Sequence, residues 1–198
     1  MRIRRCWPFL AMGVYLLTLA AGCNRHVTHG LGLDAMYGNK DTARVPSFRL
    51  ERTILPSMKI LSYTFEAQRA DDIGQYLNAA YIELCTFINK HRLPSSKTMA
   101  FYYTYVAPFV VEAAVEVDSF PPVRDSLVNA RVLEGGEALI VHYKGPYENA
   151  GLAYHALENW LKDNHKKARG IPFEVYLNDP ITVKDKNKLL TDFYQFIQ

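Results

Sequence analysis

The stretch EALIVHYKGPYE, residues 137–148, decides how the second half of this chain folds. Apolar side chains alternate along its first seven residues, with Leu139, Val141 and Tyr143 on one side. This two-residue period predicts a β-strand. Gly145 and Pro146 end the strand, because proline has no backbone N–H to donate to a neighbouring strand. The pattern therefore predicts a strand followed by a sharp break.

A helix is predicted after the break, over about residues 147–165, because apolar residues return there every three or four positions. Gly170 and Pro172 end the connection. Residues 173–177 and 189–197 are then predicted as strands, with a turn at 178–180. The second half thus has the order strand, helix, strand, strand.

The preceding part of the chain has the same order of elements. It contains a predicted strand at 58–65, a helix that starts at Asp71 or Asp72, and strands at 99–105 and 109–118. In the last strand, valines alternate with Glu112 and Glu116, which predicts a sheet with one face in water. We therefore expect an α+β fold of duplicated β-α-β-β units: two antiparallel sheets, each with a helix, and a central ligand groove at their seam.

Three segments of the second half carry a family resemblance: HYKGPYE at 142–148, LENWL at 157–161 and PFEVYLNDP at 172–180. They resemble the GyrI-like small-molecule (effector) binding domain. The order of elements follows that family over about 58–197, although Phe196 stands where the family has proline. The resemblance implies a duplicated βαββ fold with a groove that binds cationic, aromatic or amphipathic small molecules. It also implies that Glu174 lies in the groove among aromatic residues, and that Tyr147 lines it.

The residues themselves support a role for Glu174. Glu174 and Tyr176 are two positions apart on a predicted strand, so they share a face, whereas Phe173 and Val175 share the other. We expect the apolar face to pack on the helix, which directs Glu174 and Tyr176 to the opposite side, towards solvent or a groove. A carboxylate surrounded by aromatic rings attracts a lipophilic cation by its charge and through cation–π contacts.

Further candidates for ligand binding are Tyr147, Trp160, Tyr103 and His142. Tyr147 either lines the groove or packs on the sheet, and Trp160 either forms a groove wall or contacts the sheet. His142 is a lone histidine on a strand, which is a packed or surface residue more often than a ligand. Among the tyrosines near residue 103, the sequence leaves open which one reaches the groove.

The first 23 residues have the pattern of a bacterial lipoprotein leader. A basic start is followed by an apolar run and by Ala20, Ala21, Gly22 and Cys23, which resembles a lipobox. We expect a signal peptide at 1–22, a lipid on Cys23, a flexible tether and lead-in at 23–55 and the ligand-binding domain at 56–198. The expected location is the bacterial cell envelope, anchored to a membrane on the periplasmic or extracellular face. An uncleaved anchor and ordinary secretion remain alternatives.

Charge and spacing exclude other classes of protein. Removing the three arginines of the leader from the 23 basic residues leaves 20, which equals the 20 acidic residues, so we expect no nucleic-acid binding. No cysteine or histidine spacing typical of zinc is present, and no metal or cofactor is expected. The oligomeric state stays open.

The sequence favours a lipid-anchored protein that binds a hydrophobic, cationic or aromatic small molecule. It favours binding over catalysis, because no nucleophile with a base and an orienting group is recognisable. One alternative is a hydrolase of electrophilic small molecules, with Glu174 as base and Tyr147 or Tyr176 as proton donor. Another is a haem or porphyrin carrier with His142 as axial ligand.

Overall fold

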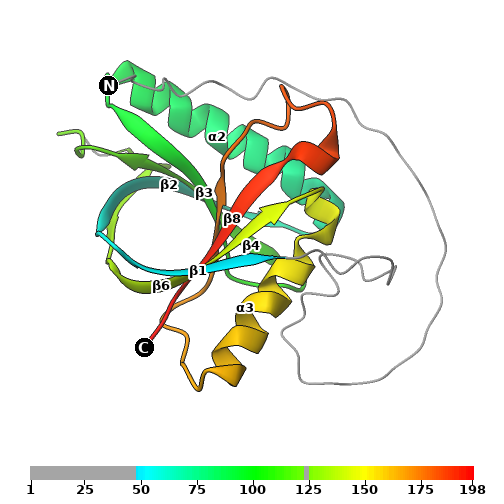
Figure 1. Ribbon diagram of the computed structural model, residues 1–198. Coiled ribbons are helices and arrows are strands. Elements are labelled where there is room, and N and C mark those ends of the chain that lie inside the picture. Colours follow the sequence, from blue (N-terminus) through cyan, green and yellow to red (C-terminus); the bar gives the residue numbers. More distant parts are fainter. Residues whose placement is uncertain (1–47, 123–124) are drawn as a thin grey trace.

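The computed structural model describes residues 48–122 and 125–198, so Cys23 lies outside the described residues. Eight strands form one strongly curled sheet in which all neighbours are antiparallel, in the order β1-β6-β8-β7-β3-β4-β2-β5 (Figure 1). The strands are β1 (Arg49–Leu55), β2 (Met58–Ala67), β3 (Ser95–Tyr102), β4 (Phe109–Val117), β5 (Asn129–Leu133), β6 (Gly136–Lys144), β7 (Phe173–Tyr176) and β8 (Leu190–Phe196). The helical elements of this part of the chain are α2 (Ile73–Lys90), α3 (Gly151–Asp163) and the 3-10 turns η1 (Ala70–Asp72), η2 (Tyr147–Asn149) and η3 (Lys186–Lys188).

The order β2-α2-β3-β4 returns as β6-α3-β7-β8. The two groups meet where β3 pairs with β7, with Thr98 opposite Tyr176 and Phe101 opposite Phe173. The expectation of two separate sheets is therefore wrong. An isolated three-stranded sheet would expose the backbone groups of β3 and β7, and their pairing satisfies both strands and produces a single sheet.

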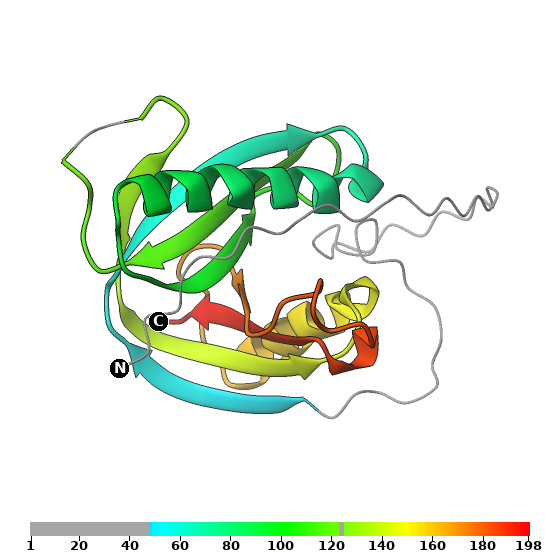
Figure 2. The ribbon, with the colours of Figure 1, turned by 90° about the horizontal axis from the view of Figure 1, so that it is seen from above.

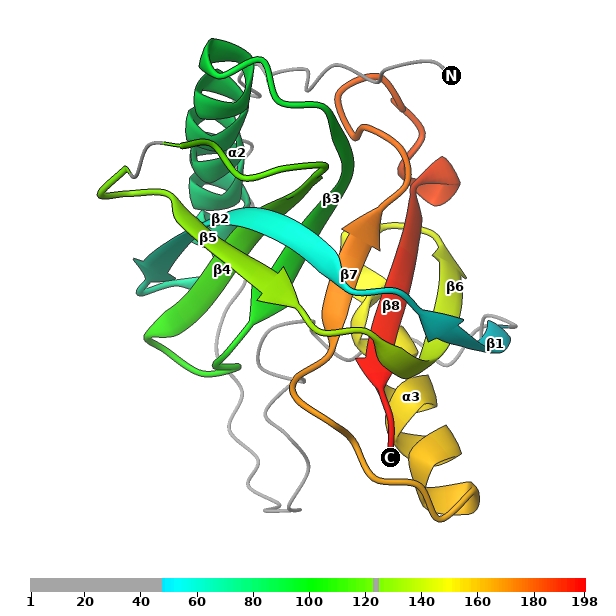
Figure 3. The same ribbon diagram turned by 90° about the vertical axis from the view of Figure 1, so that its left-hand side faces the viewer.

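Both helices pack on the same face of the sheet. Residues directly opposite one another share a face, and one such row crosses six strands: Val141, Phe193, Glu174, Ala100, Ala113 and Tyr63. The apolar stripe of α3 packs on the β6–β8 end of this row, and that of α2 packs on the β2–β4 end. Figures 2 and 3 show the helices set apart in this way. The middle strands β3 and β7 lie between them.

The opposite face is covered by the chain itself. Only two residues separate β1 from β2 and β5 from β6, and β1 pairs with β6 while β2 pairs with β5. β1 and β2 thus form one long, bent strand, and β5 and β6 form another. The two bent strands pair on both sides of their bends, where Leu55 lies opposite Gly136 and Met58 opposite Leu133, and they form the ring in Figure 1.

This ring encloses a second core that the sequence analysis did not expect. It comprises Met58, Ile60, Met99, Phe101, Ala114, Ala138, Ile140, Phe173, Val175, Tyr194 and Phe196. The expectation of a sheet face in water is wrong, since Glu112, on that face, is only 4% exposed. The alternation of valine and glutamate does not indicate a solvent-exposed face in this strand, because Arg131 forms an ion pair with Glu112 inside the fold.

Several boundaries differ from the sequence expectation. The sheet contains Arg49–Leu55, which we assigned to the lead-in, and the strand Asn129–Leu133, which we did not assign. The second helix begins at Gly151, because the turn η2 occupies Tyr147–Asn149 after Pro146. Within the described ranges, neither helix has the length and hydropathy that crossing a bilayer requires.

Candidate functional site

Glu174 lies on the sheet face that carries the helices. It is opposite Phe193 of β8 and Ala100 of β3, at the middle of the row between α3 and α2. The sequence pattern predicts that Glu174 lies on the other face, and that prediction is wrong. Phe173 and Val175 instead face the second core, because the curled sheet offers an apolar interior on the side without helices.

The carboxylate of Glu174 is buried and accepts hydrogen bonds from two phenols. Its exposed fraction is 2%. Tyr154 of α3 donates to Oε1 at 2.9 Å, and Tyr176 of β7 donates to Oε2 at 2.7 Å. Hydrogen bonds to a carboxylate are shorter and stronger than neutral ones, which is how a buried glutamate is tolerated in this position.

Six tyrosines surround this carboxylate and, with it, make up what we call the Glu174 cluster. They are Tyr81, Tyr102, Tyr105, Tyr147, Tyr154 and Tyr176. The hydroxyls of Tyr102 and Tyr176 are 3.4 Å apart. Edge-to-face ring contacts join Tyr176 to Tyr147 and to Tyr81, with centroids 5.7 and 6.5 Å apart, and Tyr105 to Tyr154 at 6.2 Å. The cluster draws on both helices and on both middle strands, so neither half of the chain could form it alone.

Four phenols of the cluster have a raised pKa and stay protonated well above neutral pH. Burial, followed by the negative charge of Glu174, raises the pKa of Tyr154, Tyr176 and Tyr147 above the ordinary value. The same two causes raise the pKa of Tyr105 to about 12. Each phenol therefore keeps its O–H as a donor, and the site combines one carboxylate with neutral aromatic rings.

The cluster reaches the surface through three of its rings. Tyr81, Tyr102 and Tyr154 are buried, whereas Tyr105, Tyr147 and Tyr176 are partly exposed. Tyr147 belongs to the turn η2. The next residue of this turn, Glu148, forms an ion pair of 2.6 Å with Lys186. Tyr105, Tyr147 and Tyr176 are therefore the members of the cluster that solvent reaches.

Two of the other candidate residues lie apart from the cluster. Trp160 packs with α3 against β6 and β8, as part of the core beneath that helix. The hydroxyl of Tyr103 donates to Glu112 at 2.6 Å, and Arg131 pairs with the same carboxylate at 2.7 Å, on the face opposite Glu174. Tyr103 is therefore an exposed residue whose hydroxyl reaches Glu112. Its neighbour Tyr102 is buried and belongs to the Glu174 cluster.

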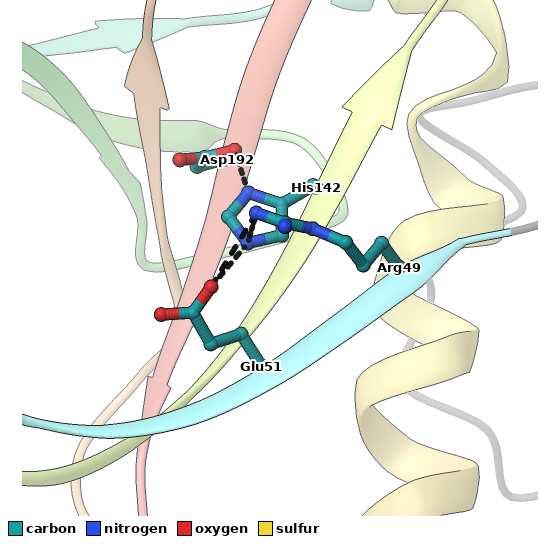
Figure 4. A network of polar contacts seen from close by, with 4 residues as sticks. All are labelled: Arg49, Glu51, His142 and Asp192. Carbon is teal, nitrogen blue, oxygen red and sulfur yellow. Dashed lines mark hydrogen bonds and ion pairs between the residues drawn. The ribbon is translucent and has the colours of Figure 1, made fainter.

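His142 also lies on the face opposite Glu174, in a polar network at the edge of the sheet (Figure 4). Its Nδ1 is 2.8 Å from Asp192, and its Nε2 is 3.2 Å from Glu51 and 3.1 Å from Arg49. Arg49 can only donate, so it bonds a neutral imidazole, whereas an imidazolium would donate to Glu51. Because both ring nitrogens have partners, an axial bond to haem would have to displace Arg49 and Glu51.

The sequence leaves open whether Tyr102 or Tyr105 reaches the groove, and it does not predict the two cluster residues Tyr81 and Tyr154. Tyr81 follows Leu77 at helical spacing and Tyr154 lies on the apolar stripe of α3, so both had the pattern of core residues. Nothing in the sequence shows that the apolar stripes of α2 and α3 lie on either side of the paired strands β3 and β7. No group of three or more His, Cys, Asp or Glu side chains arranged to hold a metal occurs within residues 48–122 and 125–198.

Comparison with known proteins gives one family and several related folds. A family model described as GyrI-like small molecule binding domain matches residues 68–195. No curated protein matches the sequence significantly. The crystal structure of the EcmrR C-terminal domain has a TM-score of 0.62 and 19% identity, over 77% of this chain and 98% of that one. EcmrR in complex with DNA gives a TM-score of 0.66 and 19% identity over 79% of this chain, which spans 59% of that longer chain.

Two further structures share the fold at lower similarity. A hydrolase from Listeria innocua has a TM-score of 0.53 and 16% identity, over 78% of this chain and 94% of that one. The protein SAV2435 bound to tetraphenylphosphonium has a TM-score of 0.50 and 9% identity, over 76% and 94%. At these identities, the likeness establishes the fold.

Proposed function

We propose, since the chain belongs to the family of GyrI-like small molecule binding domains, that it binds a hydrophobic, cationic or aromatic small molecule at the Glu174 cluster. One observation carries the proposal. A carboxylate that is 2% exposed lies between two helices and is surrounded by six tyrosines from both halves of the chain. Buried carboxylates are rare in proteins, and titratable groups with shifted pKa values concentrate at functional sites.

The chemistry of the cluster suits a lipophilic cation. The charge of Glu174 attracts a positive ligand, and the ring faces of tyrosines add about 0.5–2 kcal/mol per cation–π contact. The phenols are neutral, so they do not repel an apolar ligand as ionised groups would. A relative of the same fold, SAV2435, was solved with tetraphenylphosphonium, which is a cation of this class.

A ligand has to move at least one ring to reach Glu174. We propose Tyr147 for this role, because it is partly exposed, stands in the short turn η2 and contacts Tyr176 edge-on with centroids 5.7 Å apart. Rotation of an aromatic side chain at a partly exposed site needs no change of the sheet. Binding would then replace the contact of Tyr147 with Tyr176 by contacts with the ligand.

Titration calorimetry with tetraphenylphosphonium tests the proposal. We expect saturable binding to the wild-type protein and an affinity lower by about tenfold or more for Glu174→Gln, because the variant keeps the shape of the side chain and loses its charge. Glu116→Gln is the matched control, since Glu116 pairs with Lys97 on the opposite face. Its affinity should equal that of the wild type.

Two outcomes would contradict this function. One is the absence of binding to wild-type protein over a panel of lipophilic cations. The other is an equal loss of affinity in the Glu174 and Glu116 variants, which would indicate an effect of overall charge.

A second candidate function is hydrolysis of an electrophilic small molecule. It is favoured by the 2.7 Å hydrogen bond between Tyr176 and Glu174, which places a protonated phenol beside a carboxylate, and a hydrolase from Listeria innocua has the same fold. Glu174 would accept a proton from water and Tyr147 or Tyr176 would donate one to the leaving group. Turnover of electrophiles that disappears in Glu174→Gln would support catalysis, and binding without turnover would leave the first function.

We further propose that Cys23 carries a lipid that anchors the protein to a membrane of the cell envelope. The proposal rests on the basic, apolar and small-residue pattern of residues 1–23. Expression of the full chain with radiolabelled palmitate should label the wild type and leave Cys23→Ser unlabelled and outside the membrane fraction. An unlabelled wild-type protein would disprove the anchor without bearing on ligand binding.

A further inference from the structure

Two buried hydroxyls lack a hydrogen-bond partner in the described part of the chain: those of Ser62 and Thr191. Both residues are fully buried. Buried polar groups in proteins almost always have partners, so each exception calls for an explanation.

Ser62 has an explanation within the protein. It lies on the face opposite the helices, where it is close enough to Glu112 to help Arg131 and Tyr103 lower the pKa of that carboxyl against the effect of burial. Its hydroxyl therefore faces a charged group of the second core. Nothing comparable accounts for Thr191.

Thr191 lies beside the Glu174 cluster. On β8 it is directly opposite Tyr176 of β7 on one side and Tyr143 of β6 on the other, so its side chain shares the face of both. The next residue of β8 on that face is Phe193, which packs edge-to-face on Tyr154 with centroids 5.0 Å apart. Thr191 thus occupies the floor of the same sheet surface, one pair along from Glu174.

Within residues 48–122 and 125–198, the groups around Thr191 leave its hydroxyl without a hydrogen-bond partner. Tyr143 donates its own O–H to the carbonyl of Pro146 at 2.7 Å. Tyr176 donates its O–H to Glu174 at 2.7 Å, so that proton is not given to Thr191. Tyr147, which contacts Tyr176, stands at the outer end of this region.

We propose that Thr191 is a second recognition point of the ligand site, which hydrogen-bonds a hydroxyl, amine or carbonyl group carried by the cationic ligand. The proposal rests on the proposed function of the Glu174 cluster and makes it more specific. Glu174 and the rings recognise charge and aromatic surface, and Thr191 distinguishes ligands by one polar substituent. The natural ligand is then an amphipathic cation with a polar group, and not a purely apolar one.

A parent cation and three hydroxylated derivatives test the role of Thr191. Tetraphenylphosphonium has no hydrogen-bonding group, and its ortho-, meta- and para-monohydroxylated derivatives add one at three positions. We expect at least one derivative to bind the wild type about three- to tenfold more tightly than the parent, which corresponds to one neutral hydrogen bond. In Thr191→Val this advantage should disappear while the parent binds as before, and Thr191→Ser should retain it.

Controls separate this proposal from folding effects and from the proposed function. Valine has the shape of threonine without the unpartnered hydroxyl, so the unfolding free energy of Thr191→Val should be equal to or above that of the wild type. Ser62→Ala should leave the preference for the hydroxylated derivative intact. If no derivative gains affinity, or if the gain persists in Thr191→Val, the recognition point is disproved. Failure of the parent cation to bind at all would instead count against the function proposed for Glu174.

Discussion

The hydroxyl of Tyr154 has a charged and buried acceptor, so we expect it to stabilise the fold more than an ordinary phenol does. It donates to the buried carboxylate of Glu174 at 2.9 Å, and both residues are 2% exposed. In Tyr154→Phe the carboxylate loses a donor that water cannot replace. We expect the unfolding free energy to fall by about 1.5–3 kcal/mol, measured by urea denaturation.

Tyr105→Phe is the control for this prediction. The ring of Tyr105 contacts Tyr154, with centroids 6.2 Å apart, and it is partly exposed. Removal of its hydroxyl should cost less than half as much as removal of the Tyr154 hydroxyl. Equal losses would mean that the donor to Glu174 has no special role.

Glu112 gives the stability a dependence on acidic pH. Burial alone would raise its pKa, but hydrogen bonds from Arg131 and Tyr103 and the charge of Arg131 outweigh burial and lower it. A depressed pKa in the folded state stabilises the protein above the ordinary value of 4.5, and this stabilisation is lost as the pH falls through the folded value.

We therefore expect Glu112→Gln to lower the unfolding free energy by about 1–3 kcal/mol at pH 7. The difference between variant and wild type should begin to shrink below about pH 4.5, where the carboxyl of the unfolded chain takes up a proton, and it should be lost as the pH falls through the lower pKa of the folded state. Denaturation at a series of pH values between 7 and 3 measures this. A difference that stays constant over that range would show that the charge of Glu112 is not responsible.

At the scale of elements, the crossing of the two bent strands depends on Gly135. A side-chain carbon at this position would touch the carbonyl oxygen of Leu55 and approach the backbone carbon of Pro56 to 2.6 Å. Backbone atoms of a paired strand cannot move aside without breaking the pairing of β1 with β6. We expect Gly135→Ala to lower the unfolding free energy by several kcal/mol, roughly 3 or more, or to prevent folding.

Gly74→Ala provides the matched comparison. Gly74 lies in the first turn of α2, and a side-chain carbon there would meet no atom within 4 Å. Since alanine is the better helix former, the midpoint of thermal unfolding should rise, with a gain of roughly 0.5–1 kcal/mol. If both glycines tolerate alanine, the close approach of the two strands does not determine the fold.

The elements differ in how far the sequence predicts them. The apolar stripes of α2 and α3 and the alternation in β6 are local patterns, so those elements were found from sequence to within a few residues at most ends. The face that each strand buries is not local. Phe173 and Glu174 point to opposite faces of the sheet, as the alternation predicts. The apolar side of such a strand can pack on a helix or into the interior of a curled sheet, and the sequence pattern is the same in both cases.

At the scale of the whole molecule, the two groups of elements form one folding unit. Phe173 of the second group is 1% exposed and stacks on Phe101 of the first, with ring centroids 5.0 Å apart. Its loss should leave a cavity in the core that both groups share. We expect Phe173→Ala to cost about 3–5 kcal/mol and to lower the protection of β4 and β8 amides equally in hydrogen exchange.

Leu177→Ala is the control, because Leu177 follows the same strand and is 45% exposed. It should leave protection in both groups close to wild type. Loss of protection in β8 alone in the Phe173 variant would show that the two groups unfold separately, and would contradict the single shared core.

Local patterns along the chain are enough to predict the two helices, most strands, their repeated order and the family to which residues 68–195 belong, because each of these depends on residues that are near one another in sequence. The sequence also pointed to Glu174, Tyr176 and Tyr147 together. Local patterns do not predict that β3 and β7 pair, that Glu174 faces the helices, or that Tyr81 of α2 and Tyr154 of α3 lie beside it; the three-dimensional fold shows all three. These features depend on which strands, distant in sequence, form hydrogen bonds with one another. They also depend on which apolar surfaces are left to be buried after those strands have paired.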